Sequence, residues 1–327
     1  MEEDEIKIDY HKKIKRALRE IAKMVVGQDH MISRLLIGLF TNGHILLEGV
    51  PGLAKTLTIS TLSKVLNLKF QRIQFTPDLL PADLVGTMIY NQKESDFEVK
   101  KGPIFANLIL ADEVNRAPAK VQSALLEAMQ EKQVTIGEST FFLDRPFLVL
   151  ATQNPVEHEG TYPLPEAQVD RFMMKIHVSY LSKDLELEVM RRMSNMHFAP
   201  EVRAILSKSD IMGIRNEINK IGISESLEKY IIELVHATRY PQEYPSLRNE
   251  ARYIQYGVST RACIDLNLGA KALAFMDERN YVLPDDIKEI AKDVFNHRLI
   301  LNYEAEAEGI TQNQIIKSIL DQVPISK

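Results

Sequence analysis

The chain has 327 residues, of which 45% are hydrophobic and 26% are charged, a composition ordinary for a soluble globular protein with more than one domain. The formal net charge of −5 at pH 7 gives no general support to a nucleic-acid binder, although a local basic patch is still open. The single cysteine, Cys263, excludes an intrachain disulfide and fits a reducing compartment.

The N-terminal segment is acidic over residues 1–5 and lacks the basic and apolar regions of a signal peptide. No uninterrupted apolar run along the chain approaches the length needed to span a membrane. The histidines are scattered without metal-ligand spacing, so none is expected to hold a metal. We therefore predict a cytoplasmic protein without a membrane span.

Apolar spacing predicts helices over 10–24 and 31–40, after which strands and helices alternate. Helices are expected at 55–66 and 121–130. Strands are expected at 44–47, 70–75, 108–111, 147–152 and 172–178. Strands separated by helices imply an α/β fold with a parallel, doubly wound sheet.

Beyond residue 182 the strand signal disappears and the sequence predicts helices only, with 240–257 as a loop between them. The expected helices are 183–194, 224–238, 260–277, 284–296 and 312–320. We therefore expect an α/β domain over 1–182 and a smaller helical domain over 183–327.

Two insertions in the first half are predicted to be hairpins. One lies within 76–102, with strands near 88–90 and 97–99, and is expected to be set into a helix. The other lies within about 132–146 and turns at Gly137-Glu138-Ser139. Neither carries a strong basic or aromatic cluster, so contact with a partner and an ordinary surface position are both left open.

The stretch Gly49-Val50-Pro51-Gly52-Leu53-Ala54-Lys55-Thr56-Leu57 follows a short apolar strand and opens a helical pattern. Backbone amides in such a turn cradle phosphate oxygens, and the N-terminus of the helix adds partial positive charge. Lys55 could reach the β- and γ-phosphates, and the Thr56 hydroxyl could bind Mg²⁺. Ala54 replaces the usual glycine, and we expect it in the first turn of the helix. The alternative is a tight turn without a ligand.

Asp112 and Glu113 follow an apolar strand and are expected at the carboxyl edge of the sheet, where ligands of open α/β sheets bind. Asp112 could hold Mg²⁺ through water, and Glu113 could act as the general base toward an attacking water. The alternative is a pair of solvated or helix-capping acids.

Asn154 and Arg261 are further candidates for phosphate contacts, and Arg171 is considered with them for its position. Asn154 ends another apolar strand and could hydrogen-bond the γ-phosphate or the attacking water, or simply form part of an Asn-Pro turn. Arg171 lies just before the last strand. Arg261 begins a helix with Ser259 as a candidate N-cap, and its charge opposes the helix dipole there, which suggests an anionic partner.

Taken together, these motifs resemble the AAA+ ATPases and, within them, the MoxR family. The resemblance covers residues 10–320 and is carried by 25–28, 48–56, 112–118, 153–157 and 159–172. Alanine before Lys55 is itself the form that this family uses. The resemblance implies a P-loop AAA+ core with a five-stranded parallel sheet and a smaller all-α lid domain.

The resemblance also assigns roles. Lys55 and Thr56 match Walker A, Asp112 and Glu113 match Walker B, and Asn154 and Arg261 match sensors 1 and 2. Val26, Gly27 and Gln28 match the segment beside the adenine. Arg171 matches the arginine finger that acts on the neighbouring subunit of a hexameric ring, and Arg116 is a weaker candidate for a role across subunits.

The function that the resemblance implies is ATP hydrolysis with Mg²⁺, coupled to chaperone-like remodelling or maturation of a client protein. A partner with a von Willebrand factor A domain is often involved. Two alternatives are kept: a nucleic-acid-stimulated motor of the same clade, and a nucleotide-gated scaffold. A small-molecule P-loop kinase is disfavoured because the helical half supplies a sensor arginine rather than a substrate lid.

Overall fold

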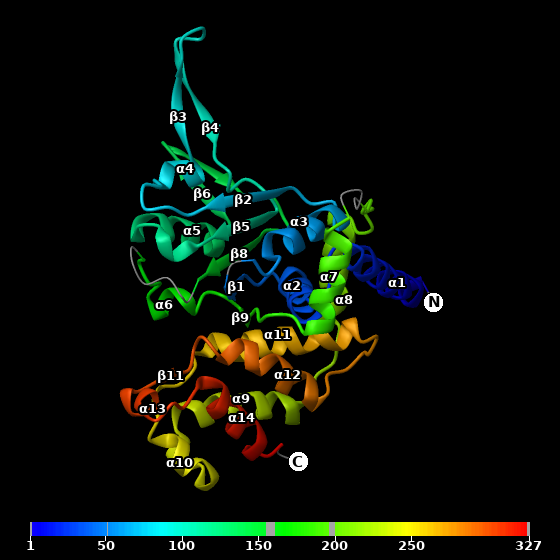
Figure 1. The fold of residues 1–327 in the computed structure, drawn as a ribbon, viewed down its shortest axis with the longest axis vertical. Helices are drawn as coiled ribbons and strands as arrows, with labels where there is room; N and C mark the ends of the chain where they lie inside the picture. The colour runs from blue at the N-terminus through cyan, green and yellow to red at the C-terminus, as the bar shows by residue number, and fades with distance from the viewer. Residues whose placement is uncertain (1, 51, 155–160, 196–199, 326–327) are drawn as a thin grey trace. The chain divides into compact units, whose positions relative to one another are not determined.

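The computed structural model describes residues 2–50, 52–154, 161–195 and 200–325 (Figure 1). Contacts divide the chain into two compact units. The first is Met1–Leu164 with Ile176–Ile214, and the second is Pro165–Lys175 with Arg215–Lys327. The sequence boundary was expected near residue 182; by contacts, residues 183–214 pack with the first unit and residues 165–175 with the second.

The fold is built on a five-stranded sheet in the order β2–β5–β8–β1–β9. Its strands are β1 (Ile45–Glu48), β2 (Phe70–Gln74), β5 (Leu108–Asp112), β8 (Leu148–Gln153) and β9 (Met174–His177). The pairs β2–β5, β5–β8 and β1–β8 are parallel, and β1, β5 and β8 consist almost entirely of buried residues. Buried, continuously apolar strands are typical of parallel sheets covered by helices, so the predicted α/β class is confirmed.

The helices of the first unit are α1 (Glu2–Ala22), α2 (Asp29–Thr41), α3 (Lys55–Val65), α5 (Ala119–Glu131) and α7 (Lys183–Met193), with α8 (Lys208–Asn219) crossing into the second. α2 contributes nine buried residues to the core, and its C-cap Asn42 is left-handed, which ends the helix before β1. α8 was not among the predicted helices, although Ile211, Ile214 and Ile218 have helical spacing and are buried.

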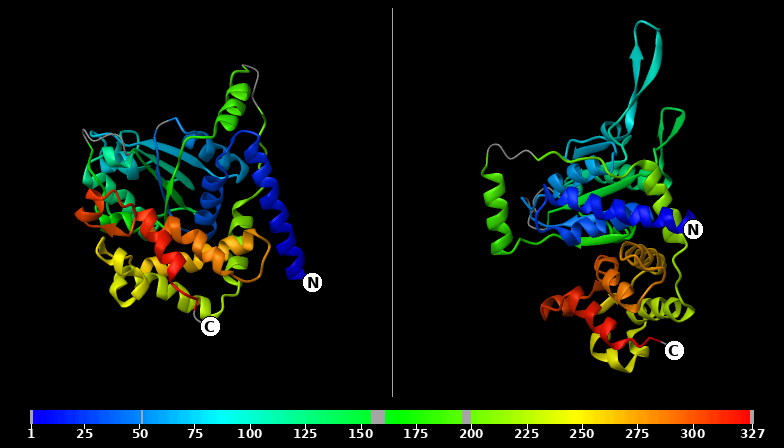
Figure 2. Two further views of the ribbon diagram at one scale, coloured as in Figure 1. Left: turned by 60° about the horizontal axis from the view of Figure 1, so that its bottom comes forward. Right: turned by 90° about the vertical axis from the view of Figure 1, so that its right-hand side faces the viewer.

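Both expected hairpins are present and project from the first unit (Figures 1 and 2). β3 (Gly86–Asn91) pairs with β4 (Asp96–Lys101), and β6 (Gln133–Ile136) pairs with β7 (Ser139–Phe142). The first hairpin is not set into a helix: α4 (Pro81–Val85) precedes it, and the chain returns through Gly102 to β5. A Cβ on Gly86 would lie 2.3 Å from the Lys100 carbonyl oxygen, so the base of the hairpin requires glycine.

The second unit is mostly helical, with α9 (Glu225–Arg239), α11 (Thr260–Met276), α12 (Pro284–Phe295) and α14 (Gln312–Gln322) packed together. Shorter helices are α6 (Glu166–Val169), α10 (Arg248–Ala251) and α13 (Tyr303–Ala307). The expectation of helices alone was wrong, since β10 (Ile254–Tyr256) pairs antiparallel with β11 (Ile300–Leu301). Strands this short show no recognisable alternation of apolar residues in the sequence. The predicted loop 240–257 also contains α10 and β10, so it is not entirely loop.

Among the described residues, no helix combines the length and apolar character that crossing a bilayer requires.

Candidate functional site

A pocket of about 400 Å³ lies in the first unit where the carboxyl ends of β1, β5 and β8 meet the N-terminus of α3. Its lining combines backbone N–H groups of the loop with the side chains of one lysine, one arginine, two acids and two carboxamide residues. The lining residues are Gly49, Gly52, Leu53, Ala54, Lys55, Thr56, Leu57, Arg72, Asp112, Glu113, Thr152, Gln153 and Asn154. Asp112, Glu113 and Asn154 therefore lie together at the carboxyl edge of the sheet, as predicted, and Lys55 of the loop lines the same cavity.

The loop between β1 and α3 is shaped by its glycines. A Cβ on Gly49 would lie 2.6 Å from the Val178 carbonyl oxygen, and Gly52 has a φ of +87°. The Lys55 ammonium donates to the Gly49 carbonyl at 2.5 Å, which turns the side chain back across the loop. Val50 does not line the pocket, and Pro51 lies outside the described residues.

Ala54 is the N-cap of α3 and adopts the left-handed conformation, with φ 57° and ψ 18°. It is therefore not in the first helical turn, as the sequence suggested, and it takes a conformation that costs an L-residue about 1–2 kcal/mol. No side chain caps this helix. The amides of its first turn therefore face the pocket without a protein partner from the cap, which is the arrangement that binds anions.

Two opposing effects act on the pKa of the Lys55 ammonium. Burial lowers the pKa of the Lys55 ammonium, and the charges of Asp112 and Glu113 oppose that shift. A phosphate placed between the lysine and the amides of α3 would favour the charged form for the same reason as the two acids do.

The two acids are held in different ways. Asp112 ends β5, and its Oδ1 accepts from the Thr152 hydroxyl at 2.6 Å. Glu113 has a left-handed backbone, with φ 56°, and its N–H donates to the same Thr152 oxygen at 2.8 Å. Non-glycine residues in this conformation are held there by their surroundings, and they cluster at functional sites.

Sequence analysis missed the polar partners of these acids on β2. Arg72 donates to Asp112 Oδ2 from Nε at 3.0 Å and from Nη2 at 2.6 Å, and Gln74 donates to Glu113 Oε2 at 2.8 Å. Residues 72 and 74 lie on one face of β2, and Gln74 is in register with Asp112. The only sequence signal was that Arg72 and Gln74 flank the apolar Ile73 and so share one face of β2. That signal identifies no partner until the strand order places β2 beside β5.

The donors around this pocket fit a magnesium ion. The Thr56 hydroxyl and the Asp112 carboxylate are hard oxygen ligands, and Mg²⁺ in nucleotide sites needs only one or two such ligands besides phosphate and water. No cluster of three His, Cys, Asp or Glu side chains suited to a metal occurs among the described residues. A metal here would therefore depend on phosphate oxygens to complete its coordination.

A second, largely apolar pocket of about 400 Å³ adjoins the first and shares Gly52, Leu53, Ala54 and Leu57 with it. Val26 and Gln28 line it, together with Met24, Val25, Tyr180, Leu181, Glu186, Val189, Met190 and Met193. Gly27 lies between them with a φ of +70°, and a Cβ there would lie 2.8 Å from both Leu181 and Leu185. The pocket has the size and character of a nucleobase site, with polar groups in the minority.

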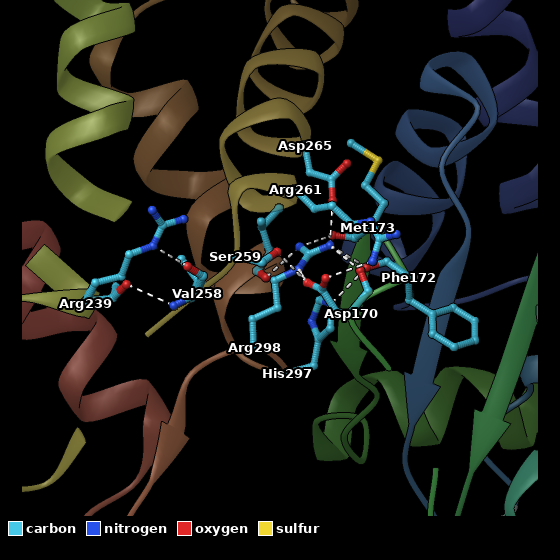
Figure 3. A network of polar contacts seen from close by, with 12 residues as sticks. Asp170, Phe172, Met173, Arg239, Val258, Ser259, Arg261, Asp265, His297 and Arg298 are labelled. Atoms are coloured by element: carbon cyan, nitrogen blue, oxygen red, sulfur yellow. Dashed lines mark hydrogen bonds and ion pairs between the residues drawn. The ribbon is translucent and has the colours of Figure 1, made fainter. Parts of the chain in front are cut away.

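The two remaining predicted arginines belong to the second unit. Figure 3 shows Arg261 beside Asp170. Arg171 follows Asp170 in the chain and is half-buried. Arg261 Nη1 donates to Asp170 Oδ2 at 3.0 Å, so the anionic partner that it has in this structure is a carboxylate. Ser259 occupies the N-cap position of α11, but its hydroxyl donates to Asp170 Oδ1 rather than capping the helix.

Comparison with known proteins agrees with this geometry. Residues 44–174 match the model of the ATPase family associated with various cellular activities (AAA), and residues 247–319 match the AAA lid domain. Chaperone MoxR1 of Mycobacterium tuberculosis is 46% identical over 95% of this chain and 82% of its own length. The chain belongs to the MoxR family of AAA+ ATPases.

Other similar proteins match over nearly the whole chain. The uncharacterized protein YeaC of Bacillus subtilis is 42% identical over 97% of this chain and 96% of its own. Protein MoxR of Methylorubrum extorquens is 30% identical over 98% and 97%. A crystal structure of a candidate ATPase from Cytophaga hutchinsonii matches with a TM-score of 0.95 and 69% identity, covering 100% of this chain and 98% of that one. The MoxR-type fold of core and lid is thus confirmed.

Proposed function

We propose that this MoxR-type chain hydrolyses ATP with Mg²⁺ and uses the energy to remodel or mature partner proteins. One observation carries the proposal: the uncapped N-terminus of α3 and Lys55 share a pocket with two acids at the end of β5. A triphosphate fits the cationic side, and an attacking water fits the side of the acids. The adjoining apolar pocket supports a nucleoside as the remainder of the ligand.

The protein groups divide the work on the γ-phosphate. Glu113 polarises the attacking water, and Asn154 helps to orient it. Lys55 and the amides of α3 stabilise the charge that develops on the transferred phosphoryl oxygens. Thr56 and Asp112 would hold a Mg²⁺ ion, which would supply positive charge to offset part of the charge on the phosphates. Val26, Gly27 and Gln28 would line the base.

Two arginines of the second unit would complete the chemistry. Arg261 would exchange Asp170 for phosphate and so link the nucleotide state to the lid. Arg171 would act on the nucleotide of the next subunit in a ring, which we propose to be a hexamer. An arginine finger is worth about 10³–10⁵ in kcat, or about 4–7 kcal/mol of barrier. A lone subunit is therefore expected to be nearly inactive.

The name of one relative, Chaperone MoxR1, supports a chaperone-like role for the work done by hydrolysis. We propose that the client is a protein in the cytoplasm, with a von Willebrand factor A domain partner as one candidate. Capture of clients on a Glu113→Gln variant, which would hold ATP without hydrolysing it, tests this part directly.

The catalytic assignment is tested by two variants of the pocket. Glu113→Gln should bind ATP in calorimetry with affinity near that of the parent, but phosphate release should fall by at least about 10²-fold because the base is lost. Lys55→Ala should lose ATP binding. Near-normal turnover by Glu113→Gln would show that Glu113 is not the general base. If Lys55→Ala bound ATP as tightly as the parent, the proposed phosphate site would be wrong.

A further inference from the structure

Arg298, in the turn after α12, is the most heavily bonded side chain of the second unit among the described residues. Its side chain is 1% exposed. It donates to six acceptors within 3.1 Å: the Asp170 carboxylate and carbonyl, the Asp265 carboxylate, and the carbonyls of Phe172, Met173 and Val294. Figure 3 shows the guanidinium of Arg298 with Asp170, Asp265, Phe172 and Met173 around it.

Four of the six acceptors belong to the segment 170–173, which surrounds Arg171 on both sides. The carbonyls of Asp170, Phe172 and Met173 all accept from Arg298. His297 also contacts the Phe172 carbonyl at 2.9 Å, and the Phe172 side chain is fully buried. The backbone before and after Arg171 is therefore held by the turn 297–298, and the direction in which the Arg171 side chain leaves the backbone is restricted.

We propose that Arg298 is a positioning residue: held by Asp265, it clamps the segment 170–173 and so presents Arg171 to the nucleotide of a neighbouring subunit. This inference rests on the proposed function of Arg171 in a ring. It assigns Arg171 to a unit formed with α11 and the turn after α12, so the arginine and the helical unit would move together.

Asp170 has a double role in this arrangement. Its Oδ1 accepts from Arg298 and Ser259, and its Oδ2 accepts from Arg261. When Arg261 turns to phosphate, the bond from Arg298 to Oδ1 and those to the backbone carbonyls remain. Arg298 therefore keeps Arg171 in place in both states, whereas Arg261 is free to exchange partners.

Only arginine meets the geometry of this clamp. Its planar guanidinium offers five N–H donors in a rigid fork, whereas lysine offers a single ammonium that cannot span acceptors on both sides of Arg171. Arg298→Lys therefore keeps the charge but releases part of the segment. Asp265→Asn keeps the shape and weakens the hold on Arg298, so it tests the same clamp with a milder change.

We expect these variants to supply Arg171 poorly to the neighbouring subunit while their own nucleotide site stays intact. Arg298→Lys and Asp265→Asn should bind ATP within about twofold of the parent, and kcat should fall about 10–100-fold, a fraction of the value of the whole arginine finger. Arg279→Lys is the matched control. Arg279 forms a bidentate pair with the buried Asp286 in the same unit but does not touch 170–173. It should leave kcat unchanged.

Subunit mixing separates this role from a structural one. Glu113→Gln subunits have an inactive site but an intact Arg171, so in mixed rings they should restore hydrolysis to the sites of Arg298→Lys or Asp265→Asn subunits. Rings that contain both kinds of subunit are verified by co-purification through two different tags. Rescue supports the clamp.

Two outcomes would overturn the proposal, and they are distinguishable. If Arg171→Ala is rescued by Glu113→Gln but neither clamp variant is, Arg298 acts within its own subunit and the positioning role is wrong. If none of the three is rescued in verified mixed rings, the shared site of the proposed function is wrong, and the clamp has no arginine finger to present. Should Arg298→Lys fail to fold, Asp265→Asn decides.

Discussion

At the level of single residues, Arg72 occupies the position in the pocket that a cation would be expected to take. Its guanidinium pairs with Asp112 Oδ2, while Asp112 Oδ1 is engaged by Thr152. Both carboxylate oxygens of the expected metal ligand are thus in use, and a metal must compete with Arg72 for one of them. Since the Arg72 side chain is 48% exposed, the pair is worth only about 0.2–1 kcal/mol.

Arg72→Gln should therefore make Mg²⁺ or Mn²⁺ bind about 1.4–5-fold more tightly to the nucleotide-bound protein, because Asp112 no longer pairs with an arginine. The measurement is a metal titration of the nucleotide-bound protein, by electron paramagnetic resonance for Mn²⁺. Lys229→Gln, which breaks an exposed pair with Glu225 on α9, is the control and should change nothing. Weaker nucleotide binding in Arg72→Gln would instead show that Arg72 contacts phosphate.

Ala54 and Glu113 illustrate a second point at this level. Both are non-glycine residues with left-handed backbone, one at the start of α3 and the other directly after β5. In each case the residue lies beside the pocket, at the point where the regular strand or helix conformation begins or ends. The strain is local, and it places amides or a carboxylate where regular structure would not.

At the level of secondary-structure elements, α11 and the turn after α12 are joined by a buried acid. Asp265 on α11 faces Arg298, Asp170 and Arg261. Burial raises the pKa of Asp265 to about 6, and the charge of Asp170 adds to the shift, although Arg298 and Arg261 oppose it. Burial also raises the pKa of Asp170, but hydrogen bonds from Ser259 and Arg298 outweigh it, and the net pKa is lowered.

The raised pKa of Asp265 predicts a pH dependence of stability. The folded state binds this proton more tightly than the unfolded chain, so the contribution is fully present below about pH 4 and is lost as pH rises through about 6. The free energy of unfolding of the parent, relative to Asp265→Asn, should thus fall by about 2 kcal/mol between pH 4 and 7.

Denaturant unfolding of both proteins across this pH range measures the difference. The low pKa of the buried His297 changes stability in the opposite direction, but the two proteins share it, so it cancels. A difference that is flat from pH 4 to 7 would show that Asp265 is ionised throughout and that the Arg298 pair is a full ion pair in both limits.

The two hairpins also belong to this level. They contact each other: a Cβ on Gly137, at the turn of the second hairpin, would lie 3.2 Å from Met88 Cγ of β3. Met88, Ile89, Tyr90 and Phe97 are exposed on the first hairpin, and Phe142 is exposed on the second. These exposed apolar side chains are available for contact with a partner, which is one of the two interpretations given for the hairpins.

At the level of the whole molecule, the proposed ring makes a prediction about concentration. If Arg171 completes the site of a neighbour, ATPase activity per subunit should fall as the ring dissociates, by up to about 10³-fold or more for isolated subunits. Specific activity should be followed over a dilution series with light scattering in parallel. Constant activity in a sample that is monomeric throughout would show that each subunit is catalytically complete.

The five strands of the sheet and the phosphate loop could be predicted from local sequence because each is written in a continuous segment. Ile45–Leu47, Leu108–Leu110 and Leu148–Leu150 are apolar runs that end in polar residues, and the loop 49–57 has its own spacing. The helices of the second unit have clear periods as well. In contrast, the β10–β11 pair joins two short segments far apart in the chain, and no local pattern signals it.

The sequence alone determined the fold class, and it predicted the candidate site residues: Lys55, the paired acids, Asn154 and the two arginines, each beside a segment whose apolar period is local. Only the tertiary structure decided which residues hold them: Arg72 and Gln74 on the acids, and Arg298 around Arg171. The physical reason is that a lone arginine in a strand or turn has no period and no spacing. Its partner is set by strand order and helix packing, which bring Arg298 to Asp170, 128 positions earlier in the chain.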